Sequence, residues 1–115
     1  MDQTTQERSS LLAQELARIL DHLRERYRPL CVILFGSLAR GEVREGSDID
    51  LCVIKETDSP FLERLREVRM AADAHEAVDI LVYTPEEWRQ MVREGNYFIL
   101  EEVLGRGRVL HGKPA

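Results

Sequence analysis

Two short groups of residues in the first half of the chain could together hold a phosphorylated ligand. Gly36 and Ser37 follow an apolar run, and ten residues later Asp48 and Asp50 flank an isoleucine. A glycine turn that opens a helix leaves backbone N–H groups available for phosphate, and the serine adds a hydroxyl donor. A Gly-Ser pair after a strand is also common in ordinary turns, so the turn alone leaves both interpretations open.

The aspartate pair suits a hard divalent cation. Residues two apart in a strand share a face, with Cα atoms about 6.5–7 Å apart. At that separation Asp48 and Asp50 can converge on Mg²⁺, which prefers carboxylate and water oxygens. The alternative is that both lie at an exposed strand entrance and cap a turn with Ser47.

A third acid, Asp79, interrupts the apolar run Val78–Val82. A charge in a buried strand is costly unless it is paired or coordinates a metal, although an aspartate at a strand end can also bond to backbone or to an arginine. If the strands are neighbours, Asp79 completes a site of three carboxylates with Asp48 and Asp50. Three carboxylates beside a phosphate-holding turn suit a two-metal, in-line displacement at phosphorus.

The whole chain sets limits on the class of protein. Its 115 residues predict a single domain, residues 1–115, with 43% hydrophobic and 32% charged residues. The net charge of −5 argues against a protein that grips nucleic acid through phosphates. Residues 1–10 are polar and the apolar runs are short, which predicts a cytoplasmic protein that does not enter a membrane. Cys31 and Cys52 lie in apolar segments and are expected to be buried free thiols.

Local patterns predict the elements that would position these residues. Helical spacing of apolar residues predicts a helix over residues 6–28 that ends at Pro29. Strands are expected at residues 30–35, 48–55 and 77–83, with a terminal edge strand near 109–110. In the second strand, Ile49, Leu51 and Val53 should face away from the two aspartates.

Further helices are expected after the second and third strands. Ser59 and Pro60 are predicted to be the N-cap and the first helical residue of a helix whose buried stripe is Phe61, Leu65, Val68 and Ala72. Residues 84–87 form a capping box that opens a helix through Arg93. A short helix over residues 96–104 follows. An apolar cluster near the C-terminus is expected to fill the core, with part of it left as a candidate partner interface; its members are Trp88, Met91, Tyr97, Phe98 and Leu100. The order predicts an α/β (α+β) fold: a small mixed sheet with flanking helices.

The motif resembles the signature of the DNA polymerase β-type nucleotidyltransferases, with Gly36-Ser37, ten residues, and Asp48-Ile49-Asp50. The short length and the segment around Asp79 resemble the minimal nucleotidyltransferase (MNT) domains of prokaryotes, over roughly residues 10–110. The resemblance implies a nucleotidyltransferase fold in which Gly36 and Ser37 hold the phosphates of a nucleoside triphosphate. It implies two Mg²⁺ ions on Asp48, Asp50 and Asp79, the catalytic residues. Arg40 and Ser47 are further candidates for nucleotide binding.

The family also suggests the acceptor. The chain has room for a nucleotide site and little for an acceptor domain, and stand-alone MNT domains are often encoded with a helical HEPN toxin, a ribonuclease-type protein. The resemblance therefore implies transfer of AMP from ATP to a tyrosine of such a partner by an antitoxin. Alternatives are a nucleotide-sensing module that masks a partner without chemistry and, less favoured, a metal-dependent phosphodiesterase. The sequence leaves open a homo-oligomer.

Overall fold

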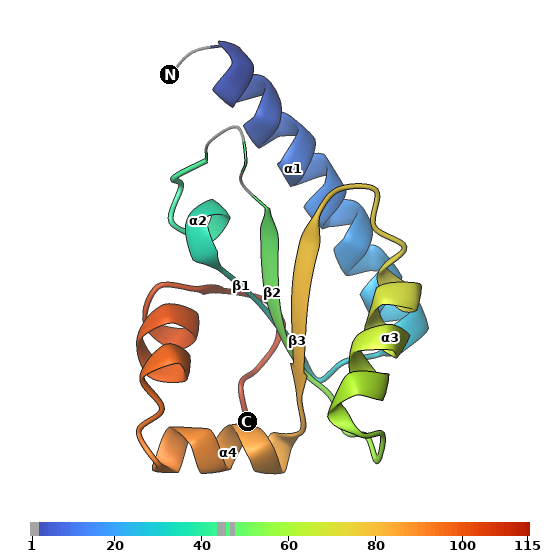
Figure 1. Ribbon diagram of the computed structural model, residues 1–115, viewed down its shortest axis with the longest axis vertical. Coiled ribbons are helices and arrows are strands. Elements are labelled where there is room, and N and C mark those ends of the chain that lie inside the picture. Colours follow the sequence, from blue (N-terminus) through green and yellow to red (C-terminus); the bar gives the residue numbers. More distant parts are fainter. Residues whose placement is uncertain (1–2, 44–45, 47) are drawn as a thin grey trace.

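A mixed β-sheet forms the centre of the molecule (Figure 1). The structure is a computed structural model that describes residues 3–43, 46 and 48–115. Within these residues the sheet has four strands in the order β3-β2-β1-β4. β1 runs antiparallel to β2 and β4, whereas β2 and β3 are parallel. The strands are β1 (Cys31–Phe35), β2 (Ile49–Ile54), β3 (Val78–Tyr83) and β4 (Arg108–Gly112).

Helices cover both faces of the sheet, as the sequence predicts. One face carries α1 (Gln3–His22), its π-helical continuation η1 (Leu23–Tyr27) and α3 (Phe61–Ala72). The other carries α4 (Pro85–Arg93) and the π-helical segment η2 (Phe98–Gly105). The short α2 (Gly36–Ala39) follows β1 directly and lies at one end of the sheet (Figure 1). The fold is therefore a mixed sheet between two helical layers, with a turn at its end.

The first helix ends close to its predicted position. Its last turn widens into η1, and Arg28 then adopts a left-handed conformation with φ 54°. The Arg28 N–H donates to the carbonyl of Leu23 at 2.8 Å, which satisfies one of the carbonyls that a helix end leaves open. Pro29 follows and cannot continue the helix.

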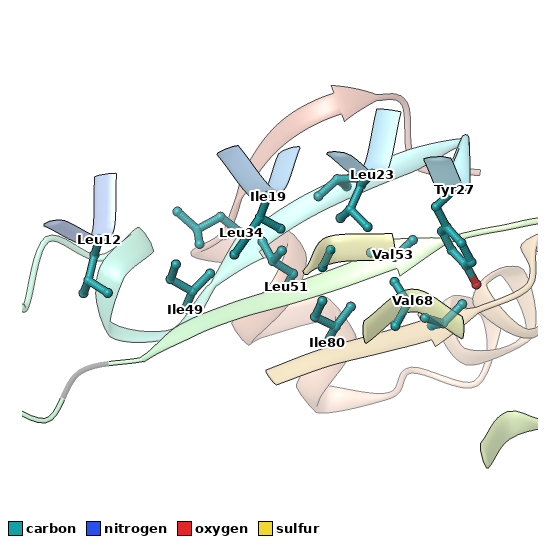
Figure 2. Packing of buried hydrophobic residues seen from close by; sticks show 13 residues of the cluster. Leu12, Ile19, Leu23, Tyr27, Leu34, Ile49, Leu51, Val53, Val68 and Ile80 are labelled. Carbon is teal, nitrogen blue, oxygen red and sulfur yellow. The ribbon is translucent and has the colours of Figure 1, made fainter. Parts of the chain in front are cut away.

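The larger core lies between the sheet and the layer of α1, η1 and α3 (Figure 2). The alternation predicted for β2 is confirmed: Ile49, Leu51 and Val53 belong to this core, whereas Cys52 and Ile54 belong to the core on the opposite face. Because both faces of β2 are covered, its side chains are buried almost without interruption. Asp50 is the exception, since it is only half-buried.

The second core lies under α4 and η2. Trp88 on α4 is 1% exposed, and Ile99 and Val103 on η2 are fully buried. Cys31 and Cys52 are buried free thiols, as expected. The aromatic prediction is only partly right: Tyr97 is 76% and Phe98 36% exposed, so this pair does not fill the core.

Two predictions for α3 are wrong. Pro60, rather than Ser59, occupies the N-cap position, and the Ser59 hydroxyl donates to Glu67 at 2.9 Å instead of capping the helix. Phe61 is 42% exposed, and Arg64 takes the buried position one turn further on. Arg64 can be buried because its guanidinium donates to Glu87 at 2.7 Å and to the carbonyl of Ser59, also at 2.7 Å.

The capping box of α4 is confirmed. The Glu87 N–H donates to the Thr84 hydroxyl at 3.2 Å, and the Thr84 N–H donates to the Glu87 carboxylate at 2.8 Å. Pro85 supplies the first helical residue, where its missing N–H costs nothing. In the described ranges, no helix is long and apolar enough to cross a membrane.

Candidate active site

Two of the three predicted acids lie directly opposite each other. Asp50 on β2 pairs in register with Asp79 on β3. In a parallel pair, residues in register project to the same face of the sheet, so both carboxylates lie on the side of the core that contains Cys52. Asp79 comes 29 positions after Asp50, with α3 in between, and the parallel pairing of β2 with β3 brings the two residues together.

The surroundings of Asp79 differ from the prediction. The apolar run around it predicts a buried strand, but β3 is an edge strand and Asp79 is exposed. The desolvation cost expected for a buried carboxylate is therefore absent at Asp79. Asp79 is instead the carboxylate at the open edge of the site, where solvent reaches it.

Gly36 makes room for Asp50. Gly36 has φ +79°, and a Cβ added there would overlap Oδ2 of Asp50 and lie 3.1 Å from its Cγ. The preceding residue, Phe35, pairs in register with Asp50 across β1 and β2. The turn and the carboxylate thus pack against each other, and only a glycine satisfies both the backbone conformation and the space.

Asp50 is electrostatically uncompensated. Burial, followed by the carboxylates of Asp79 and Asp48, raises its pKa to about 6, whereas Arg40 opposes the rise. A carboxylate with such neighbours holds a proton more tightly than in water, and a bound cation would relieve the same cost. The raised pKa reflects burial first, and then the nearby carboxylates of Asp79 and Asp48.

Asp48 precedes β2 and is half-buried, and it lies close enough to Asp50 to raise the pKa of that carboxyl. Ser47, the predicted nucleotide-binding serine, lies outside the described residues. Among the described residues, no three His, Cys, Asp or Glu side chains converge tightly enough to form a metal-binding group. The three acids are neighbours in this structure rather than a closed cage.

Arg40 joins the site from the end of α2. Its Nε donates to Glu42 at 3.2 Å, and its Nη1 forms an ion pair with Glu102 on η2. Glu102 also raises the pKa of Asp50, which places its charge near the acids. No local sequence pattern marks Glu102, because it lies 62 positions after Arg40 in the chain. Ser37 is half-buried within α2, next to Gly36.

A buried glutamate fixes the loop that leads into β3. Glu15 on α1 accepts hydrogen bonds from the backbone N–H groups of His75 and Glu76, the second at 2.8 Å. Arg8 adds an ion pair to Glu76 at 2.7 Å. The pKa of Glu15 falls to about 2, chiefly because Arg18 donates to it and because the loop N–H groups favour its charged form. Asp79 lies three residues after Glu76, the last loop residue that these contacts hold.

The family model for the nucleotidyltransferase domain matches residues 16–111, most of the chain. The chain belongs to the nucleotidyltransferase domain family. The matched range contains the glycine turn, the three acids, Arg40 and Glu102, and the four-stranded sheet with flanking helices is the fold of this family. A nucleotidyltransferase domain moves a nucleoside monophosphate, so the enzyme class predicted from the motif is confirmed.

This nucleotidyltransferase domain is similar to a curated relative and, in fold, to solved structures. The chain is 32% identical over 94 residues, 78% of this chain and 82% of the relative, to a Haemophilus influenzae protein named as probable protein adenylyltransferase MntA. The crystal structure of a protein described as a putative nucleotidyltransferase from Sulfolobus solfataricus matches with a TM-score of 0.63 and 22% identity, over 78% of this chain and 82% of that one. A chain from the tri-AMPylated Shewanella oneidensis HEPN toxin in complex with MNT antitoxin matches with a TM-score of 0.50 and 20% identity, over 89% and 73%.

Proposed function

We propose that this nucleotidyltransferase domain transfers AMP from ATP, with Mg²⁺, to a hydroxyl group of a partner protein. The observation that carries the proposal is the arrangement of Asp50, which packs into the space left by Gly36 and lies in register with Asp79. It brings a turn suited to phosphate together with uncompensated carboxylates. A phosphorylated substrate and its cation need these two features at one place.

Each residue has a role in this proposal. The backbone N–H groups of Gly36 and Ser37 hold the triphosphate, and Arg40 donates to its outer phosphates, with Ser47 as a further nucleotide contact. Asp48 and Asp50 would bind both Mg²⁺ ions, and Asp79 would bind the one on the acceptor side. The donor set fits, because acidic oxygens around a half-buried carboxylate with a raised pKa favour a hard cation. When bound, the ions would lower the pKa of the acceptor hydroxyl and offset the triphosphate charge.

The transfer balances as a single displacement at phosphorus. The acceptor oxygen forms a bond to the α-phosphorus, the bond from that phosphorus to the bridging oxygen breaks, and pyrophosphate leaves. The hydroxyl proton passes to solvent or to a nearby carboxylate. Asp79 is exposed at the open edge of the sheet, which gives a protein side chain a route to the site. Arg40 and the turn hold the leaving group in line.

The family relatives support a protein acceptor. The curated relative is named as a protein adenylyltransferase, and one structural match is to a chain from a complex of an AMPylated HEPN toxin with an MNT antitoxin. By analogy, the acceptor here is a tyrosine of a HEPN-type toxin, and the protein is the antitoxin of the pair. ATP as the donor fits the cytoplasmic location predicted from the sequence.

Label transfer tests the proposal directly. The protein is incubated with ATP labelled at the α-phosphate, Mg²⁺ and the HEPN-type protein encoded beside it. We expect label on a tyrosine of the partner, identified by mass spectrometry. Transfer should be lost in Asp50→Asn and on addition of EDTA, because both remove metal binding.

Asp58→Asn serves as the matched control, since it makes the same chemical change at an exposed position after β2. It should transfer label at the wild-type rate. If Asp50→Asn still neutralises the partner's toxicity and the wild type transfers no label, the protein is a masking module and the proposed transfer is wrong.

A further inference from the structure

Arg40 contacts two carboxylates that come from different parts of the chain. Its Nε donates to Glu42, two residues away, and its Nη1 is paired with Glu102, on a different element. The side chains of Arg40 and Glu102 are 28% and 29% exposed, so the pair lies at the rim of the site rather than in open solvent. An unpaired arginine samples many rotamers, whereas two ion pairs favour the orientation of the guanidinium that makes both of them.

The segment that supplies Glu102 is itself fixed. Glu102 is flanked on η2 by Ile99 and Val103, both fully buried in the core under the sheet. Phe98, on the same segment, packs edge-on against Phe35, with ring centroids 5.3 Å apart and planes at 87°. Phe35 is the residue before Gly36. The contact between Phe98 and Phe35 therefore connects η2, which carries Glu102, to β1, which leads into the turn at Gly36.

From this geometry we propose that Glu102 is a positioning residue that orients Arg40 toward the triphosphate; the inference rests on the proposed function. Nε and Nη1 of Arg40 are engaged by carboxylates, but a guanidinium carries five N–H donors in a rigid fork. Arg40 can therefore keep both ion pairs and donate to a phosphate with its remaining N–H groups. Glu102 acts through Arg40 and does not touch the nucleotide.

The size of the effect follows from that of a partly exposed ion pair. Such pairs contribute about 0.2–1 kcal/mol to the stability of the arrangement that contains them. Without the pair, nucleotide binding must itself fix the rotamer of Arg40, and this ordering costs binding free energy. Glu102→Ala should therefore weaken binding of Mg²⁺–AMP-PNP by about 1.4- to fivefold. Glu102→Gln keeps an oxygen that can accept from Nη1, so it should restore most of the wild-type affinity.

The experiment is a double-mutant cycle in calorimetric titrations with Mg²⁺–AMP-PNP. It compares the wild type, Glu102→Ala, Glu102→Gln, Arg40→Ala and the variant that combines Arg40→Ala with Glu102→Ala. Glu101→Ala is the control, because Glu101 is the exposed neighbour on the same segment. NMR relaxation of the Arg40 side-chain Nε, without nucleotide, reports whether Glu102→Ala releases the guanidinium. Melting temperatures show that each variant is folded.

We expect Glu102→Ala to weaken binding in the wild-type background and to have no further effect once Arg40 is alanine. We also expect Arg40 to become more mobile in Glu102→Ala and Glu101→Ala to behave as wild type. Unchanged or tighter binding by Glu102→Ala overturns the inference, as does an equal loss in the Arg40→Ala background. A wild type that binds no Mg²⁺–AMP-PNP overturns the proposed function, whereas a wild type that binds it independently of Glu102 overturns only the positioning role.

Discussion

Asp50 on β2 and Asp79 on β3 lie in register across the only parallel strand pair among the described strands. Each carboxylate therefore contributes to the potential at the other. The effect is unequal, because Asp50 is half-buried whereas Asp79 is exposed. The raised pKa of Asp50 reports this relationship and can be measured without a substrate.

Removal of the Asp79 charge should lower the pKa of Asp50 from its value of about 6. Burial is the larger cause of the rise, so the pKa in Asp79→Asn should remain above the 3.8 of a free aspartate. Carboxyl ¹³C chemical shifts followed against pH in the absence of metal measure it. Asp73→Asn, an exposed aspartate in the α3–β3 loop, should leave the titration unchanged. An unchanged pKa in Asp79→Asn would show that the two carboxylates do not interact.

Asp50→Asn should stabilise the metal-free protein at high pH. The folded-state pKa of about 6 lies above the 3.8 of the unfolded chain, so the ionised carboxylate costs stability above about pH 6. That cost disappears as the pH falls from 6 to 4, because the folded state takes up the proton first. The gain in unfolding free energy should be on the order of 1–3 kcal/mol at pH 8 and close to nothing at pH 4. Urea unfolding at both pH values in EDTA measures it, and Asp58→Asn should show no such difference.

Gly36→Ala should impair nucleotide binding more than folding. Both Gly36 and Gly41 have positive φ, so alanine at either position should cost about 1 kcal/mol of stability from backbone strain. Among the described residues, a Cβ at Gly41 has no atom within 4 Å, whereas at Gly36 it overlaps the Asp50 carboxylate. Gly41→Ala is therefore the matched control for strain alone. We expect Mg²⁺–AMP-PNP affinity to fall at least tenfold in Gly36→Ala and to be nearly unchanged in Gly41→Ala. Equal losses in the two variants would contradict the contact.

Glu15 should make the fold sensitive to acid. Its side chain is 5% exposed, and its pKa is about 2 in the folded state against 4.5 when unfolded. A depressed pKa contributes stability above about pH 4.5, and this contribution is lost as the pH falls toward 2. Its full value is at most about 3 kcal/mol. In Glu15→Gln, the stability should therefore depend less on pH between pH 4.5 and 2, as measured by acid unfolding followed by circular dichroism. This variant should also be less stable than the wild type at pH 7. Glu25→Gln, an exposed position on η1, should follow the wild-type curve.

Local patterns identified the parts of the fold that depend on neighbouring residues. The capping box at Thr84 and Glu87 was predicted because both partners lie within one helical turn. The alternation in β2 was predicted because it reflects the period of a strand. The Gly-Ser turn and the acids were found from their spacing, and the structure brings Gly36, Asp50 and Asp79 together.

The mistaken and missed features depend on distant partners. Arg64 is buried because Glu87, 23 residues away, accepts from its guanidinium, and nothing in the helix sequence signals that pairing. Asp79 is exposed because it lies near the start of the edge strand β3, on the face of that strand that is less covered, and an apolar run alone does not show which face of a strand is covered. Glu102 reaches Arg40 only after η2 has packed under the sheet.

The pairing of β4 with β1 affects the order in which the sheet can be completed during synthesis. β2 leaves the ribosome soon after β1, and β3 also precedes β4, so the strands that carry Asp50 and Asp79 can pair before β4 is made. The other side of β1 stays uncovered until residues 108–112 have been made. Throughout that interval, the strand that leads into Gly36 presents open backbone groups to other chains. Addition of β4 covers this edge of β1 and removes it as a pairing site for other nascent chains.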